Sequence, residues 1–527
     1  MIVSRKARRR GLALAVVAVF ALAGCTGGNA ASTAPPPNSE ADIDPDAILR
    51  FSSAAPLPLL DPVLQPSYGL QGYLALVYDR LTMIDKDNRV IPGLATEWKF
   101  APDGTHLEVK LRSDVKFHDG TVFDAAAVKA NIDRGKNFPG STVKAALADI
   151  TAVEVVDPTT VRLALAKGTG VQLPSSLATN AGMMVSPKAI GDPASDLSSK
   201  PGNAGSGPYV VSEFVPQEKL VVKKAPGYWD PKAGRLAGIQ LERVPEASTR
   251  LKGVQTGQTD LSYVSSANDL AQAKQLSETG QLNFLPVTYR NVIGVYLRAG
   301  RGDLVKPEVR QAIAHAIDPE AVNALFSGMC APHRQLHPDG EWPAIKNYKY
   351  PYGFDAAKAK SLVTAAGGAK VDITFAAGTN AEQPANVVQG ALAAAGIDAN
   401  LNPVPNSESE ARFIAGDFEL LVASSMSPKI DPADTVNTFL LGTYKLAAKP
   451  ALVQDLAAEA GDPALSQEQR APLYERIWAT TLEEAWYVPI CRLTNAAISN
   501  NKVMFVDDVP WADIGIWDLR NVAMRKG

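Results

Sequence analysis

The sequence predicts an α/β protein built from several lobes, and three observations support this. The first is length: without residues 1–24, which we set aside below, 503 of the 527 residues remain, roughly three domains at about 150 residues each. The second is pattern, because short alternating runs typical of strands are interspersed with runs of helical periodicity. The third is composition, with 46% hydrophobic and 20% charged residues, as in ordinary globular proteins.

The first 25 residues have the layout of a secretory signal. A basic head, from Arg5 to Arg10, precedes the apolar or small run Gly11–Gly24, which at about 14 residues is shorter than the roughly 20 that span a bilayer. Leu22-Ala23-Gly24-Cys25 resembles a bacterial lipobox. That resemblance implies cleavage before Cys25, a lipid on this cysteine, and an extracytoplasmic lipoprotein anchored to the cell membrane. The alternatives are an ordinary signal peptide with an incidental cysteine and an uncleaved anchor.

Charge and cysteine content narrow the class further. Residues 1–24 carry five Lys and Arg and no acid, so the remainder has 47 basic against 55 acidic residues, a balance of −8. This argues against a nucleic-acid binder, which would present a basic surface. Beside Cys25 only Cys330 and Cys491 remain, and in an oxidising compartment we expect them to form a disulfide; two separately buried thiols are the alternative.

The amino-terminal part of the chain predicts a tether and then a mixed fold. Residues 25–47 are rich in Gly, Ala, Ser, Pro and Asn and predict a disordered tether, with the fold beginning near Ile48. Apolar residues from Leu70 to Tyr78 are spaced like one face of a helix. Alternating runs on both sides of Pro102-Asp103-Gly104 predict a hairpin, and those around Asp157-Pro158 predict another strand pair.

Helix starts and further strands follow in order. Asp124 is expected to cap a helix, and Gly205–Tyr209 opens a region with strands near 210–211, 220–222 and 239–244. Pro307 and Pro319 are placed like first helical residues. Asp355 is expected to cap a further helix, which Gly367-Gly368 would terminate. Ser466 and Gln469 form a possible capping box at the start of another helix.

Seven stretches, in order along the chain, resemble the extracytoplasmic solute-binding proteins of ABC importers, in the large peptide/nickel-binding class known as family 5. Their sequences match the family's "PGLA-x-x-W", "LR-x-x-VKFHDG", "GTGPY", "YW", "VRQAI…AID", "YD…KAK-x-L" and "YVP" stretches. They are Pro92–Trp98, Leu111–Gly120, Gly205–Tyr209, Tyr228-Trp229, Val309–Asp318, Phe354–Leu362 and Tyr487–Pro489.

The resemblance implies a two-lobed periplasmic-binding-protein-like fold of type II, with an extra domain inserted in the first lobe. The first lobe would comprise residues 48–80, 200–285 and 495–527, the inserted domain 81–199, and the second lobe 286–494. A peptide or other small solute would lie between the lobes, which close over it and present it to an ABC permease and ATPase. We expect a monomer. A transport-independent sensor or envelope regulator on the same fold is the alternative.

Ligand contacts are expected where aromatic, apolar and small polar residues could form cleft walls. Peptide binders of the family carry Trp-x-Ala-Asp-Tyr-x-Asp-Pro, whose first Asp pairs with the peptide amine. Aligned on Asp431-Pro432, this chain has Pro428 at the amine-binding position and Lys429 at the Tyr position. We therefore expect a site that does not depend on a free amine, unless Asp431 or Asp434 substitutes for the missing amine-binding carboxylate. Its ligand would be a blocked or modified peptide, a sugar-like molecule or another uncharged solute, or an anion near Lys429. The expected contacts are Tyr68, Met183, Met184, Trp342, Ser424, Ser425, Met426 and Asp431.

Signatures of catalysis are nearly absent from the sequence. His-Glu-x-x-His, Gly-x-Ser-x-Gly and Walker A patterns do not occur, and Ser141-x-x-Lys144 lacks the partner motifs of penicillin-recognising enzymes. His333 and His337 lie between Pro332 and Pro338, which predicts a surface loop and not a metal site. We therefore expect no catalytic residue, cofactor or metal; a secreted hydrolase is the remaining, third class.

Overall fold

The computed structural model describes residues 38–527 apart from 56, 58, 66–70, 424–427, 443, 448–449 and 512–516. The predictions for the signal 1–24, for Cys25 and for tether residues 26–37 therefore lie outside the described residues. The same holds for the expected contacts Tyr68, Ser424, Ser425 and Met426. Residues 38–47 are not the disordered tether that the sequence predicts, because Glu40–Asp42 form a 3-10 helix and Asp42 pairs with Arg525 at 2.6 Å, so the fold begins before Ile48. None of the helices in the described ranges reaches the length and hydropathy of a bilayer-crossing segment.

The largest element is an eleven-stranded mixed sheet. Its strands are β1 (Ile48–Ser53), β8 (Tyr209–Val215), β9 (Lys219–Lys224), β10 (Gly238–Arg243), β11 (Leu261–Val264), β12 (Asn283–Leu297), β13 (Cys330–Pro332), β14 (Ala369–Ala376), β15 (Ile397–Val404), β16 (Leu420–Ala423) and β17 (Tyr487–Ser499). Their order is β15-β14-β16-β12-β17-β11-β1-β10-β9-β8, with β13 paired to β17. We call β8, β9, β10, β1 and β11 the β1 half, and β13 to β16 the β14 half.

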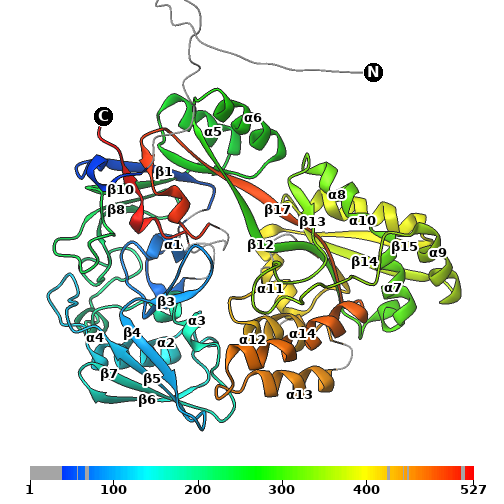
Figure 1. Ribbon diagram of the computed structural model, residues 1–527, viewed down its shortest axis with the longest axis horizontal. Helices are drawn as coiled ribbons and strands as arrows, with labels where there is room; N and C mark the ends of the chain where they lie inside the picture. Colours follow the sequence, from blue (N-terminus) through cyan, green and yellow to red (C-terminus); the bar gives the residue numbers. More distant parts are fainter. Residues whose placement is uncertain are drawn as a thin grey trace, which may run out of the picture. The chain divides into compact units, whose positions relative to one another are not determined.

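Two long antiparallel strands, β12 and β17, connect these halves (Figure 1). Residues 283–288 of β12 pair with 494–499 of β17 near the β1 half, and residues 292–296 pair with 487–492 near the β14 half. The register shifts between Thr288 and Val292, so residues 289–291 form a bulge in the middle of the crossing. The two halves of the sheet thus share one irregular strand pair.

A separate antiparallel sheet of four strands contains both predicted strand pairs. It consists of β4 (Ala95–Phe100), β5 (His106–Leu111), β6 (Ile150–Asp157) and β7 (Thr160–Leu165), in the order β4-β5-β7-β6. Asp124 caps the neighbouring helix α2 (Ala125–Asn137) by accepting a hydrogen bond from Ala127 N at 2.9 Å, as predicted. Val128 and Ile132 of α2 join the apolar core of this sheet. A two-stranded ribbon, β2 (Thr82–Ile84) with β3 (Val90–Pro92), leads into the sheet.

Among the helices that follow β12, those that start at Pro307, Pro319, Ala356 and Gln467 begin where the sequence predicts. Asp318, Asp355 and the complete capping box of Ser466 and Gln469 supply the caps of the last three, and Gly367 has φ +77° just after α9. The helices that follow β12 are α7 (Pro307–Ala316), α8 (Pro319–Leu325), α9 (Ala356–Ala365), α10 (Glu382–Ala394), α11 (Asn406–Ala415), α12 (Pro432–Thr435), α13 (Pro450–Ala460) and α14 (Gln467–Glu483).

The remaining elements are α1 (Gln71–Leu74), α3 (Leu173–Ser176), α4 (Pro187–Gly191), α5 (Ala247–Thr256), α6 (Ala267–Glu278) and the pair β18 (Val503–Met504) with β19 (Ala523–Met524). The helix predicted up to Tyr78 ends at Leu74. The next carbonyls are used elsewhere: Leu76 O accepts from Tyr209 N and Val77 O from Gly207 N, at 3.0 and 2.9 Å. Gly205 is required there, because a Cβ on it would lie 2.0 Å from Val77 O.

The apolar residues form distinct cores. One large cluster centres on the β1 half, with Phe51 and Tyr209 among its members. Two clusters lie in the β14 half and its helices, and a fourth belongs to the four-stranded sheet. Each sheet region therefore has its own core, which leaves room for a ligand cavity between regions instead of within one of them.

Candidate functional site

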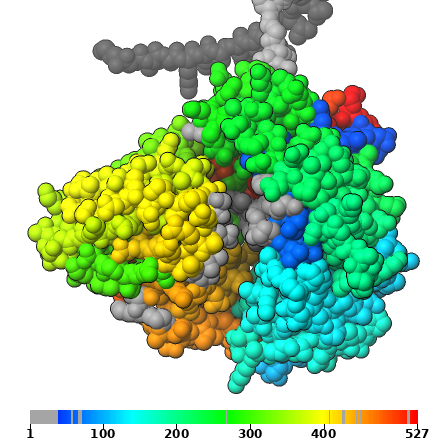
Figure 2. Space-filling model, turned by 180° about the vertical axis from the view of Figure 1, so that it is seen from behind, coloured from blue at the N-terminus to red at the C-terminus, as the bar shows by residue number. Residues whose placement is uncertain are grey.

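A cavity of about 970 Å³ lies between the four-stranded sheet with its flanking loops and the helices that follow β12. Figure 2 shows the molecule from behind, with yellow and orange residues of the segment after β12 on one side and cyan residues of the four-stranded sheet on the other. The lining residues are 87–90, 98, 100, 171, 174–175, 290, 338–342, 430–431, 463, 465, 467, 470 and 492. They come from distant parts of the chain, as in a cleft between domains.

Aromatic side chains supply the apolar part of the wall. Trp98 and Phe100 belong to β4 and Trp342 to the loop after β13, and all three are half-buried. The Trp342 ring packs edge-on against Tyr474 at 5.8 Å, and the Arg470 guanidinium lies 5.2 Å from its centroid. These contacts hold the Trp342 ring at the cavity wall, where the sequence predicts it.

Arg290 and Glu341 form a bidentate ion pair in the wall. Arg290 Nε donates to Glu341 Oε1, and Arg290 Nη2 donates to Oε2, both at 2.8 Å. Arg290 Nη1 also donates to the carbonyl of Pro428 at 3.1 Å. Burial alone would raise the pKa of Glu341, but the Arg290 pair lowers it to about 2. Glu341 is therefore a fully ionised carboxylate whose charge is already compensated.

Asp431, considered above as a substitute amine anchor, is also engaged. Both of its carboxylate oxygens accept from Arg470 Nη2, at 2.8 and 3.0 Å. Asp431 Oδ1 additionally accepts from Ala433 N at 2.9 Å and so caps α12. Arg470 is itself held by the Ala460 carbonyl. An incoming ammonium would have to compete with this buried guanidinium for the same carboxylate.

Arg492 presents a different environment. Its Nε donates to Tyr289 O at 3.0 Å, and within the described ranges its side chain makes no other hydrogen bond and no ion pair. Burial lowers the pKa of Arg492, Glu341 opposes this, and the nearby Arg290 adds to it. The side chain is half-buried and lines the cavity.

Asp434, one turn beyond Asp431, is an unusual carboxyl. Burial and the neighbouring Asp431 raise its pKa to about 7, and Asp149 from the loop before β6 contributes in the same direction. Asp149 belongs to the side of the four-stranded sheet and Asp434 to the opposite side. The two carboxyl groups thus interact electrostatically across the boundary between these sides.

The predicted contacts divide into three groups. Trp342 and Asp431 line the cavity, whereas Tyr68, Ser424, Ser425 and Met426 lie outside the described residues. Met183 and Met184 are buried in two apolar cores, with 3% and 0% of their surface exposed, and neither lines the cavity. The prediction that these two methionines wall the ligand site gains no support.

The histidine loop is buried, contrary to the surface loop that the sequence predicts. His333 and His337 retain 8% and 1% of their surface, because the loop after β13 packs against α14 and β17. His337 stacks 5.2 Å from the Trp478 ring. The described part of the chain contains no cluster of three or more His, Cys, Asp or Glu placed to hold a metal ion.

Residues that the sequence interpretation missed dominate the polar wall: Arg290, Glu341, Arg470 and Arg492. They come from four separate segments, and no local motif connects them. The nearest signals are Cys491, which precedes Arg492, and the capping box ahead of Arg470. Only the folded chain shows which charges are paired.

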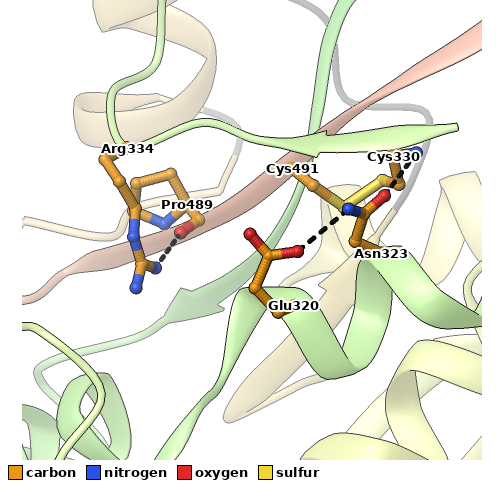
Figure 3. Close-up of a disulfide and its surroundings, with 6 residues drawn as sticks. All are labelled: Glu320, Asn323, Cys330, Arg334, Pro489 and Cys491. Carbon is orange, nitrogen blue, oxygen red and sulfur yellow. Dashed lines mark hydrogen bonds between the residues drawn. A yellow bond between two sulfur atoms is a disulfide. The ribbon is translucent and has the colours of Figure 1, made fainter. Parts of the chain in front are cut away.

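The disulfide between Cys330 and Cys491 supports this wall (Figure 3). It joins β13 to β17 with the Cα atoms 5.2 Å apart, so the pairing that the sequence predicts is present. Asn323 Oδ1 accepts from Cys330 N at 3.2 Å, and Arg334 Nη1 donates to Pro489 O at 2.9 Å. The beginning of the loop that carries Glu341 and Trp342 is thereby fixed to β17.

Comparison with known proteins gives a consistent result. The family model "Bacterial extracellular solute-binding proteins, family 5 Middle" matches residues 89–446. The glutathione-binding protein GsiB of Pectobacterium atrosepticum is 32% identical over 295 residues, covering 55% of this chain and 55% of that protein. GsiB of Salmonella paratyphi A is 33% identical over 298 residues, covering 55% of this chain and 56% of that protein. The chain thus spans about half the length of the curated relatives it matches.

Solved structures share the fold over most of the chain. NikA from Brucella suis, in complex with Fe(III)-EDTA, has a TM-score of 0.78 at 25% identity and covers 91% of this chain and 100% of its own. DppA from Helicobacter pylori, in complex with the peptide STSA, has a TM-score of 0.75 at 24% identity, covering 91% and 98%. The mixed α/β architecture described above is the architecture of these periplasmic binding proteins.

Proposed function

This chain belongs to the family 5 bacterial extracellular solute-binding proteins, and we propose that it captures a peptide-like solute and delivers it to an ABC importer. Proteins of this family bind solutes and are not enzymes, so no catalytic residue is assigned. The single observation that supports capture is the cavity of about 970 Å³, whose walls combine aromatic rings with charged groups from both sides.

We further propose the division into lobes that the resemblance implies. The first lobe comprises residues 48–80, 200–285 and 495–527, the inserted domain 81–199, and the second lobe 286–494. The separate apolar cores support this division. The bulge at 289–291, close to the boundaries at 285 and 494, supports a hinge at the strand crossing, because an irregular pair bends more easily than a continuous ladder.

Contacts across the cavity support a closed arrangement of the two sides. Ile430 packs against Ile84 and Ala178, which lie on the side of the four-stranded sheet. The turn at Gly104 lies against the loop at Pro463, since a Cβ on Gly104 would come within 3.1 Å of its ring. Such contacts would form when the lobes close over a solute.

The ligand that we propose is a peptide-like solute whose capture does not depend on a free amine. The engagement of Asp431 by Arg470 supports this, since the carboxylate nearest to the expected anchor is already neutralised. GsiB is named for glutathione, and the DppA structure contains a peptide, so peptide-like ligands occur among the relatives. Tyr68, Ser424, Ser425 and Met426 remain predicted contacts.

Location is the third part of the proposal. The lipobox-like Leu22-Ala23-Gly24-Cys25 supports a lipid on Cys25 and an extracytoplasmic, membrane-anchored protein. Replacing Cys25→Ser is expected to release the protein from the membrane fraction or to leave it unprocessed, as mass spectrometry of its amino terminus would show. An unlipidated wild-type protein that starts elsewhere would contradict the lipid anchor.

Solute capture is tested directly by ligand identification and affinity. Native mass spectrometry of the purified protein is expected to show a bound small solute, and adding that solute is expected to change the tryptophan fluorescence. Trp342→Phe should weaken binding or reduce the signal, because its ring forms the wall; an unchanged affinity and signal would remove it from the site. Binding of the solute without its uptake, in cells that express this protein together with an ABC permease and ATPase, would favour the sensor alternative.

A further inference from the structure

Three of the four arginines in the cavity wall have carboxylate partners. Arg89 pairs with Asp85 and Asp87 at 2.7 and 3.0 Å, and its side chain is 71% exposed. Arg290 pairs with Glu341 at 2.8 Å, and Arg470 pairs with Asp431 at 2.8 Å. Each of these guanidinium groups is neutralised by the protein itself and has little to gain from a ligand.

Arg492 is the exception. Among the described residues no carboxylate lies within ion-pair distance of it, and its only hydrogen bond uses Nε, which leaves both terminal nitrogens without a protein acceptor. The acid that remains in the lining, Asp339, is 80% exposed, accepts from Gln335 Nε2 and lies 4.0 Å from His333 Nδ1. It acts on the charge of Arg492 only from beyond ion-pair distance. Half-buried Arg492 is therefore the charge that most lacks a partner.

The position of Arg492 makes this charge relevant to capture. It lies on β17 directly after Cys491, whose disulfide fixes this point of the strand. Its Nε holds the carbonyl of Tyr289, within the bulge of β12 where the strands cross between the halves of the sheet. A group bound by Arg492 would therefore sit at the proposed hinge, in contact with both crossing strands through one side chain.

The chemistry of a guanidinium specifies the group it would bind. Closure over a solute removes water from Arg492, and the lost solvation is recovered only by an anion that accepts hydrogen bonds. A carboxylate matches the two terminal nitrogens in a planar, bidentate geometry, whereas a carboxamide offers one oxygen without charge. An ammonium would be repelled by Arg492.

We infer that Arg492 anchors a free carboxylate of the captured peptide-like solute and so makes that carboxylate, and not a free amine, the group on which recognition depends. This inference rests on the proposed function and specifies its ligand class. It assigns Arg492 the role of a specificity-determining residue, while Arg290 and Arg470 shape the wall through their internal pairs.

Two synthetic tripeptide libraries of identical composition provide the test, one with free carboxyl termini and one with carboxamide termini, both amino-acetylated. Native mass spectrometry and calorimetry on the intact protein are expected to show binding of the acid library at least about tenfold tighter than of the amide library. Arg492→Gln should weaken binding of the acids by about ten- to a hundredfold and leave the amides unchanged. Arg492→Lys keeps the positive charge but loses the planar pair of terminal nitrogens, so its affinity for the acids should lie between those of the wild type and Arg492→Gln.

The matched control is Arg162→Gln, which removes an exposed arginine that pairs with Glu108 outside the cavity lining and should leave both affinities unchanged. Thermal melting of each variant without ligand checks folding, and Arg492→Lys keeps the test valid if the Gln variant unfolds. Equal binding of acids and amides, an unaffected Arg492→Gln variant, or no binding of either library would overturn the inference.

These outcomes separate the inference from the proposed function. A solute that co-purifies and carries no carboxylate would overturn the role of Arg492 while supporting capture. An absence of any bound or bindable solute would overturn both.

Discussion

At the scale of single residues, one network of buried charges explains the family-like Tyr228-Trp229 motif. Asp79 accepts hydrogen bonds from Tyr228 Oη at 2.7 Å, from Trp229 Nε1 at 2.9 Å and from Arg520 Nη1 at 3.0 Å. Asp518 completes the network by pairing with Arg520. The Tyr228-Trp229 pair thus has a structural role, because each polar group on a buried aromatic residue needs a partner.

Asp434 allows a prediction of pH dependence. Its pKa of about 7 in the folded protein lies above its ordinary value of 3.8, so the folded state binds this proton more tightly than the unfolded state. The stability that Asp434 contributes therefore falls as pH rises from about 4 to about 7, and the penalty is complete above pH 7. Asp434→Asn should raise the free energy of unfolding at pH 8 by roughly 1 to 4 kcal/mol and change it little near pH 4.

Thermal or urea unfolding at pH 4, 6 and 8 measures this effect. The control is Asp398→Asn, since Asp398 is 65% exposed and lies 3.8 Å from the equally exposed Lys370, an arrangement worth little. If the variant at 434 and the wild type showed the same slope of stability against pH, the burial of this carboxyl would not be the cause.

At the scale of elements, the strand pair β12–β17 and the disulfide determine the shape of the cavity wall. The bulge at 289–291 orients Arg290 toward Glu341, and the neighbouring ladder places Arg492 opposite Val292. β13 attaches to β17 through the disulfide, and its continuation carries Trp342. Removing the cross-link should therefore affect both stability and ligand affinity.

The corresponding prediction concerns Cys330→Ser together with Cys491→Ser. The bond closes a loop of 161 residues, and its loss should lower the free energy of unfolding by roughly 2 to 5 kcal/mol. Ligand affinity should fall as well, because the loop bearing Glu341 and Trp342 loses its attachment. Chemical denaturation and calorimetry measure the two effects.

Thiol titration supplies the check on the bond itself. The unreduced wild-type fold, denatured without reductant, should show no reactive thiol from Cys330 and Cys491. Two reactive thiols would refute the bond, and an unchanged affinity in the double variant would show that the loop holds its place without it.

At the scale of the whole molecule, the contacts that close the cavity should control affinity without controlling folding. Ile430 packs against Ile84 and Ala178 on the opposite side, so Ile430→Asp would place an unpaired carboxylate in that contact. We expect ligand affinity to fall at least about tenfold and the melting temperature without ligand to stay close to the wild-type value.

The control is Val305→Asp, because Val305 is 54% exposed and is not part of the cavity lining. Calorimetry with the acetylated tripeptide acids compares the three proteins. A variant at 430 that bound as tightly as the wild type would mean that this contact does not accompany capture.

Much of the fold was accessible from the sequence because its signals are local. The hairpin around Asp103-Gly104 and the caps at Asp124, Asp355 and Ser466 depend on residues within a few positions of one another, and all were predicted. The end of α1 at Leu74 was not predicted, because the carbonyls of Leu76 and Val77 accept hydrogen bonds from a segment about 130 residues away. Local periodicity contains no information about such competition.

The candidate site depends on contacts between distant segments even more than the fold does. By itself the sequence pointed to the family, the α/β class, the cysteine pair, and Trp342 and Asp431 as candidate contacts, both of which line the cavity. Only the tertiary structure decided that Asp431 is neutralised by Arg470 and that Met183 and Met184 belong to cores. It also decided that, within the described part of the chain, the guanidinium of Arg492 lacks a carboxylate partner in the cavity. The physical reason is that charge compensation and burial depend on distances between segments that are far apart in the chain, and those distances exist only once the chain has folded.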